Sequence, residues 1–235
     1  MNQKFLLLSY PISKKTTFLP RSIGPPKIHA RSRIIPEPIN MGESETRWNS
    51  YNNTSILEMG LHTGTHIDFP FHIDSNGFKL DDFVINDFIF CKPFFIEIIK
   101  NDLEKILKEE LVYYESNLRE CDLLFIYTGF SRYRFSDPER YEMKQPDISI
   151  EAARYITSFN NIKCIAIDTI SIENLDRARP NFTVHKILLC NRKFFIIEDA
   201  NLEPLKNNFL KKVYAIPLWL LGVEATPVTI LAEVE

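Results

Sequence analysis

The sequence predicts a mixed α/β protein with a central mixed sheet, folded as a single domain over residues 1–235. Runs of β-branched and aromatic residues recur along the chain and outnumber the helical patterns that separate some of them. Hydrophobic residues make up 45% and charged residues 25% of the chain, a composition that is ordinary for a globular protein with a sizeable core. No repeat or linker divides the chain into two parts.

The N-terminal part combines one strand pattern with one long irregular stretch. Phe5–Tyr10 is expected to form a short buried strand that ends at Pro11. Residues 19–50 contain five prolines together with Gly, Ser and Asn residues, which interrupt any regular periodicity. We therefore expect a Pro-rich loop or arm without regular structure at about residues 19–50, in which His29 is solvated.

Strand and helix patterns alternate through the rest of the chain. Residues 56–61 are expected to lead as a strand into the motif described below. Asp102 is expected to begin a helix with Leu103 and Leu107 on its apolar face, and Ser149 is expected to cap a second helix. Further strands are expected at residues 94–99, 123–128, 162–168, 194–197, 213–219 and 226–235.

The stretch that is most informative about function runs from Leu61 to His72. Three of the five histidines of the chain fall within these twelve residues. An extended segment would place its imidazoles and its one carboxylate on one side, because these groups occupy alternate positions: His62, His66, Asp68 and His72. A helix fits less well, since it would rotate Asp68 away from the histidines and since glycine and proline weaken helices.

Imidazole and carboxylate groups are the ligands of Zn²⁺ and of its first-row neighbours, at distances of about 2.0–2.2 Å. A straight strand would separate His62 from Asp68 by roughly 20 Å at ~3.3 Å per residue, so the segment has to bend if both bind one ion. Gly64 tolerates the dihedral angles of a bend, and Pro70 stops the chain from continuing inside a sheet. We therefore expect a metal site here; the alternative is a strand end with three unconnected histidines.

The spacing His62-Thr-Gly-Thr-His66-Ile-Asp68-Phe-Pro70-Phe-His72 resembles the H-x-G-T-H-x-D-x-P-x-H signature of the putative cyclase family. This family consists of metal-dependent hydrolases that include bacterial kynurenine formamidases and isatin hydrolases. The resemblance implies the swivelling β/β/α fold of the family and a homodimer or homotetramer. In relatives the region equivalent to residues 19–50 covers the active site, which favours a lid or a partner-contacting arm over a plain surface loop.

The resemblance extends to a second part of the chain. Asp168-Thr-Ile-Ser171 resembles the D-T-x-S strand end of the family, and the positions of its later ligands are occupied by His185, before a Leu-rich helix, and Glu198, at the end of a strand. By resemblance, His62 and His66 bind one ion, Asp68 and Glu198 bridge two ions, and His185 completes the second. A single ion is the alternative. Zn²⁺ is the first choice of metal, and Mn²⁺ is compatible with the same ligands.

This residue set predicts hydrolysis. A bound metal lowers the pKa of its water towards ~7 and polarises a carbonyl group. Resemblance makes His72 the acid/base residue, which would deliver a proton to the departing nitrogen. We expect a hydrolase of a small-molecule amide or cyclic amide, with arylformamides as the first substrate class and lactams such as isatin as the second. The alternatives are a metal-dependent cyclase or dehydratase, and a non-catalytic binding protein on the same fold.

Composition also limits the partners and the location of the protein. With a formal net charge of −3, the chain lacks the excess of basic residues that is typical of nucleic-acid-binding proteins. The expected partner is therefore a small-molecule substrate. The apolar run near the N-terminus is too short for a signal peptide, and no run reaches the ~18 residues of a membrane-spanning helix. We therefore expect a cytoplasmic protein that does not bind membranes.

Overall fold

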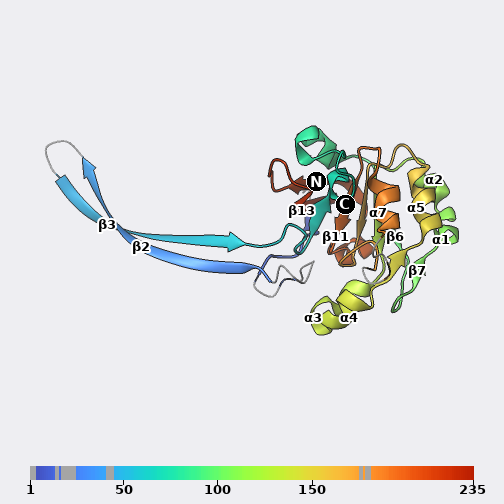
Figure 1. Ribbon diagram of the computed structural model, residues 1–235, viewed down its shortest axis with the longest axis horizontal. Helices are drawn as coiled ribbons and strands as arrows, with labels where there is room; N and C mark the ends of the chain where they lie inside the picture. The colour runs from blue at the N-terminus through green and yellow to red at the C-terminus, as the bar shows by residue number, and fades with distance from the viewer. Residues whose placement is uncertain (1–3, 14–15, 17–24, 41–44, 175–176, 178–180) are drawn as a thin grey trace.

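The computed structural model describes residues 4–13, 16, 25–40, 45–174, 177 and 181–235, and between residues 29 and 54 it describes the backbone alone. These residues form a mixed α/β body from which one long hairpin projects (Figure 1). The predicted fold class, mixed α/β with a central mixed sheet, is confirmed.

The body is built on a nine-stranded mixed sheet with the order β5-β12-β13-β4-β11-β10-β8-β6, in which β1 adds to β13. The run from β6 to β11 is parallel, whereas β4, β13, β12 and β5 pair antiparallel. β12 also lies near β6, so the sheet nearly closes into a barrel. The strands are β1 (Lys4–Leu7), β4 (His66–Asp68), β5 (Ile89–Phe90), β6 (Pro93–Glu97), β8 (Leu123–Tyr127), β10 (Cys164–Ile167), β11 (Phe195–Glu198), β12 (Leu210–Pro217) and β13 (Ala225–Val234).

Helices pack on the outer face of the parallel strands. They are α1 (Lys108–Val112), α2 (Glu115–Leu118), α5 (Ile150–Thr157) and α7 (Thr183–Leu189), while α3 (Tyr133–Ser136) and α4 (Pro138–Met143) lie at one end of the body (Figure 1).

The apolar residues of β8 are divided between two cores. Leu123 and Phe125 face the barrel interior, and Leu124 faces the helices. Burial of both faces explains why this strand is apolar throughout rather than alternating.

The expectation that residues 19–50 lack regular structure is wrong. Residues 27–40 and 45–58 form two long antiparallel strands, β2 (Lys27–Asn40) and β3 (Glu45–Glu58), which make a two-stranded sheet of their own. Pro36 and Pro38 interrupt the sequence pattern, but they have the same parity, and a strand without a second neighbour tolerates proline on its open side. The expected solvation of His29, and residues 19–24 and 41–44 of the expected stretch, lie outside the part of the chain that the structure describes.

Two other expectations need correction. The helix predicted from Asp102 begins only at Lys108, because residues 101–104 form a turn and residues 105–106 form strand β7 (Lys105–Ile106) beside β9 (Asp147–Ile148). Strand β1 exists, but it pairs only at the edge beside β13 and leaves Phe5 49% exposed, so it is not a buried strand. The predicted helix cap is confirmed, since Ser149 Oγ accepts a hydrogen bond from Ala152 N at 3.1 Å.

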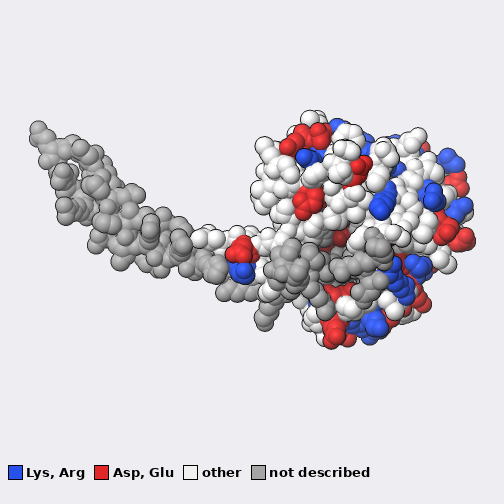
Figure 2. Space-filling view, viewed as in Figure 1, with Lys and Arg blue, Asp and Glu red and all other residues white. Residues whose placement is uncertain are grey.

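Acidic and basic side chains are interspersed over the face of the body shown in Figure 2. Among the described residues, none of the helices combines the length and the apolar character needed to cross a lipid bilayer.

Candidate metal centre

The centre is assembled by the pairing of β4 with β11. The antiparallel register places His66 opposite Glu198 and Asp68 opposite Ile196. His66 Nε2 lies 3.4 Å from Asp68 Oδ1 and 3.4 Å from Glu198 Oε2, and all three side chains are buried. Their potential ligand atoms lie within 4.8 Å of one another, so one ion can contact all three residues.

The chain bends at Gly64 as the sequence predicts. Gly64 has a φ of +68°, and a Cβ at this position would lie 2.9 Å from Cγ2 of Thr16. A residue with a side chain is therefore disfavoured both by its backbone conformation and by its neighbour. The bend returns His62 to the centre, where its Nδ1 lies 3.0 Å from Asp68 Oδ1.

His72 reaches the same place by a path that the sequence did not predict. The segment does not stay extended past Pro70, but turns into the 3₁₀ helix η1 (Pro70–His72). The imidazole nevertheless lies with its ring centroid 4.4 Å from that of His62 and 5.8 Å from that of His185. His62, Asp68 and His72 form a second group whose potential ligand atoms lie within 4.8 Å of one another.

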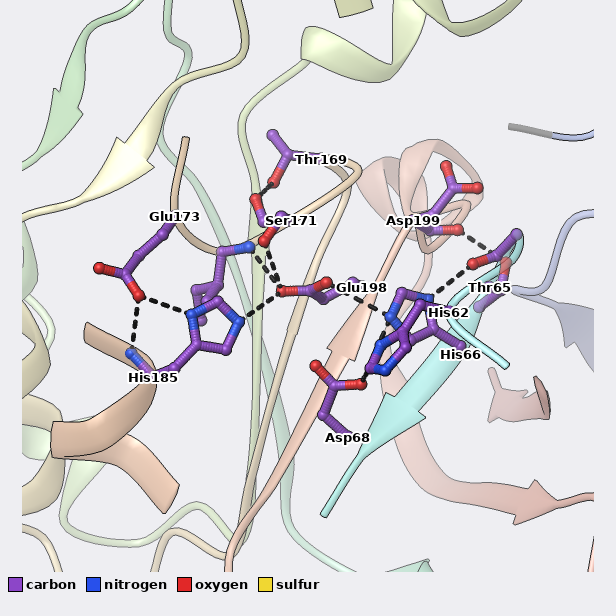
Figure 3. A network of polar contacts seen from close by, with 12 residues as sticks. His62, Thr65, His66, Asp68, Thr169, Ser171, Glu173, His185, Glu198 and Asp199 are labelled. Carbon is purple, nitrogen blue, oxygen red and sulfur yellow. Dashed lines mark hydrogen bonds and ion pairs between the residues drawn. The ribbon is translucent and has the colours of Figure 1, made fainter. Parts of the chain in front are cut away.

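His185 and Glu198 join the cluster from distant parts of the chain. His185 lies in the first turn of α7, and its Nε2 is 3.4 Å from Glu198 Oε1. Glu198 Oε1 also accepts hydrogen bonds from Ser171 Oγ at 3.0 Å and from the Ile172 amide at 2.7 Å. The structure thus brings together all six side chains that the sequence singled out, and Figure 3 shows five of them.

Each of three histidines has an acceptor on the nitrogen that faces away from the cluster. His66 Nδ1 lies 2.9 Å from the Gly64 carbonyl oxygen, His185 Nδ1 lies 2.6 Å from Glu173 Oε2, and His62 Nε2 lies 3.5 Å from Glu224 Oε1. Such acceptors fix the tautomer and the orientation of histidines that bind metals. The sequence analysis missed both carboxylates. Glu173 could have been found from the polar residues at alternate positions 169, 171 and 173, which follow a buried strand.

A separate buried network holds the residue that follows Glu198. Asp199 has a φ of +52° and accepts hydrogen bonds from Arg134 Nε at 2.7 Å, Arg134 Nη2 at 2.6 Å and the Tyr141 hydroxyl at 2.7 Å. The Thr65 hydroxyl donates to the Asp199 carbonyl oxygen at 2.6 Å. Thr65, which directly precedes β4, is therefore hydrogen-bonded to the residue that directly follows β11.

Opposite charges stabilise one another within the cluster. Burial alone would lower the pKa of His62, but the Asp68 and Glu224 carboxylates raise it to about 10. Burial likewise opposes protonation of His185, and the Glu173 and Glu198 carboxylates raise its pKa to about 10. Burial and the Asp68 charge raise the pKa of Glu198, but contacts with His185 and His66 lower it to about 2.

His72 differs from these groups. Burial lowers the pKa of His72, and the nearby His62 and His185 imidazoles act in the same direction. The His72 imidazole is therefore held neutral at pH 7, where it is able to accept a proton.

The arrangement fits a divalent cation. His66 Nε2 and both carboxylate oxygens of Asp68 are buried and make no hydrogen bond. Buried polar atoms are nearly always satisfied, so atoms without a hydrogen bond that lie within reach of one ion indicate a site for a cation. Imidazole nitrogen and carboxylate oxygen are the donors that Zn²⁺ and Mn²⁺ take.

The chain is similar in sequence and in fold to proteins of one family. A family model described as putative cyclase matches residues 6–174. An uncharacterized protein, MJ0783, of Methanocaldococcus jannaschii is 35% identical over 76% of this chain and 81% of its own length. The kynurenine formamidase of Geobacillus thermodenitrificans is 29% identical over 78% of this chain and 83% of its own length. The structure of isatin hydrolase A from Labrenzia aggregata superimposes with a TM-score of 0.74 at 20% identity, over 99% of this chain and 94% of that one, and has the same fold.

Proposed function

This chain belongs to the putative cyclase family, and on that premise we propose that it is a metal-dependent hydrolase that cleaves a C–N bond in a small-molecule amide or cyclic amide. The observation that carries the proposal is the buried group of His66, Asp68 and Glu198, in which His66 Nε2 and both Asp68 oxygens make no hydrogen bond. The relative named kynurenine formamidase supports hydrolysis of a C–N bond outside peptides.

The residues divide into those that hold the metal and one that moves a proton. His62, His66, Asp68, His185 and Glu198 would hold the cation, with Zn²⁺ as the first choice and Mn²⁺ as the second. When bound, the cation lowers the pKa of a water molecule and polarises the substrate carbonyl. His72, which is neutral at pH 7, would accept a proton and deliver it to the departing nitrogen.

We favour two ions over one, because each of the two carboxylates lies between two histidines. Asp68 belongs to both groups of potential ligands, one with His66 and Glu198 and the other with His62 and His72. A carboxylate has two oxygens and is suited to bridging, so Asp68 would be able to bridge two adjacent ions, while His72 in the second group would carry the proton rather than bind an ion. Glu198 contacts His66 through one oxygen and His185 through the other, which supports a second bridge.

Two substrate classes are proposed in order. Arylformamides of the N-formylkynurenine type come first, because the kynurenine formamidase relative aligns with most of this chain. Lactams such as isatin come second, because the likeness to isatin hydrolase A is a likeness of fold.

We also propose that the hairpin of β2 and β3 contacts a second copy of this chain. The two strands form a sheet of their own, and an isolated two-stranded hairpin is at best marginally stable in water. Near its base Ile56 is 43% and Leu57 is 52% exposed, which leaves apolar surface for a partner to cover.

Metal analysis followed by a hydrolysis screen tests the proposed function. Purified protein is analysed for bound metal and then assayed on formanilides, lactams and lactones after loading with Zn²⁺ or Mn²⁺. We expect metal at one or two ions per chain and turnover of at least one amide class. Bound metal without turnover of any of these compounds would refute the hydrolase assignment and favour a cyclase or a binding protein.

A further inference from the structure

One carboxylate outside the predicted set joins a candidate metal ligand to the start of a helix. Glu173 is 5% exposed. Its Oε1 accepts a hydrogen bond from the Val184 amide at 2.9 Å, and its Oε2 accepts one from the His185 amide at 2.9 Å. The same Oε2 lies 2.6 Å from Nδ1 of the His185 ring (Figure 3). The carboxylate thus contacts both the backbone and the side chain of His185.

The loop that carries Glu173 is itself held in place. Gln145, which is fully buried, donates its amide to the Glu173 carbonyl oxygen at 3.0 Å and accepts a hydrogen bond from the Ser171 amide at 3.0 Å. In the same loop, Ser171 Oγ and the Ile172 amide donate to Glu198 Oε1. A single short loop therefore sets the position of His185 relative to Glu198.

The contact with Glu173 also decides which nitrogen of His185 is available. A carboxylate accepts hydrogen bonds, so Nδ1 of His185 carries a proton, and Nε2, which lies 3.4 Å from Glu198 Oε1, is the nitrogen at which a cation would replace a proton. The carbonyl oxygen of Gly64 gives His66 the same arrangement. Both imidazoles thereby present Nε2 to the centre from opposite sides of Glu198.

This inference rests on the metal-binding function proposed above. We infer that Glu173 is a positioning residue for the metal centre: it fixes the tautomer and ring orientation of His185 while it holds the first turn of α7. The metal would be bound by His185 Nε2, and Glu173 would act only through that imidazole.

The test compares zinc affinity in full-length wild-type protein and in Glu173→Gln. Affinity for Zn²⁺ alone is measured by competition with a chromophoric chelator. An amide keeps the size of the side chain but removes the negative charge that accepts the Nδ1 proton. Loss of such a partner typically weakens metal binding 10–100-fold, and we expect a decrease of that order. If two ions bind, one of the two affinities should fall.

A matched control separates positioning from general loss of stability. Ser149 holds the first turn of α5 by a side-chain hydrogen bond, as Glu173 holds that of α7, but within the described part of the chain its side chain makes no hydrogen bond to the cluster. Ser149→Ala and Glu173→Gln should both lower the melting temperature of metal-free protein, and only Glu173→Gln should weaken zinc binding. Glu173→Asp retains the charge on a side chain that is shorter by one methylene group. Its zinc affinity should lie between that of the wild type and that of Glu173→Gln.

The wild-type protein offers a test that does not depend on folding of a variant. The proton of the short hydrogen bond between His185 and Glu173 should give a downfield NMR signal that persists after zinc is added, because zinc binds the other nitrogen. Loss of that signal on zinc loading would overturn the inference, and so would wild-type zinc affinity in Glu173→Gln or an equal loss in Ser149→Ala. A wild-type chain that binds no zinc or manganese would refute the proposed metal site itself, which distinguishes the two failures.

Discussion

Replacement of Arg134 by Met removes a positive charge from beside a fully buried carboxylate. Arg134 is 2% and Asp199 0% exposed, and two hydrogen bonds of 2.7 and 2.6 Å join the guanidinium to the two carboxylate oxygens. Removing one partner of a buried ion pair lowers the free energy of unfolding by about 3–5 kcal/mol, because the remaining charge stays buried without a partner in a medium of low polarity. For a chain of this size, that corresponds to a decrease in melting temperature of roughly 6–20 °C.

The measurement is a double-mutant cycle in urea, with chelator present throughout so that metal does not contribute. Asn tolerates a positive φ, so Asp199→Asn removes the charge and leaves the backbone at +52° undisturbed. The double variant Arg134→Met/Asp199→Asn should be more stable than the sum of the single changes implies, with a coupling on the order of 0.5–3 kcal/mol. A loss below about 1 kcal/mol in Arg134→Met, or strict additivity, would refute the reasoning given for this pair.

Four further predictions concern the centre, the bend and the hairpin. Chelation of metal-loaded protein should lower its melting temperature, because free metal at 100 times its Kd stabilises the folded state by about 2.7 kcal/mol; no shift in protein shown to hold metal would contradict the joint site. His72→Ala should keep its metal and show a kcat that is 10²–10⁴-fold lower, whereas His66→Ala should lose both the metal and the activity. Metal analysis and rate measurements check this, and loss of metal in both variants would make His72 a ligand. Gly64→Ala should lower the free energy of unfolding by at least about 1–2 kcal/mol, because a left-handed residue gains a Cβ that meets Thr16; unchanged stability in urea would contradict this. Replacing residues 27–58, which include the exposed Ile56 and Leu57, by a short turn should lower the molecular mass measured by light scattering, and an unchanged mass would exclude the hairpin as the subunit contact.

Features that depend on local patterns could be predicted from the sequence. Apolar runs predicted most strands of the main sheet, since a strand covered on both faces is apolar throughout. The spacing of His62, His66 and Asp68 around Gly64 predicted a bent cluster of potential ligands, because residues so close in sequence need only one turn to meet. The side chain of Ser149 predicted a helix start, since capping depends only on the next few residues.

Only the tertiary structure decided which distant groups meet these residues. Glu198 faces His66 because β4 enters the sheet antiparallel to β11, and no local pattern encodes that register. His185 and Glu198 were assigned from family resemblance, since a histidine in a first helical turn and a glutamate after an apolar strand are both ordinary. Glu173 and Glu224 were missed for the same reason, as were the turn that places His72 and the pairing of Arg134 with Asp199. The hairpin was mistaken for a loop, because prolines that break the pattern of a central strand are tolerated in a strand with an open edge.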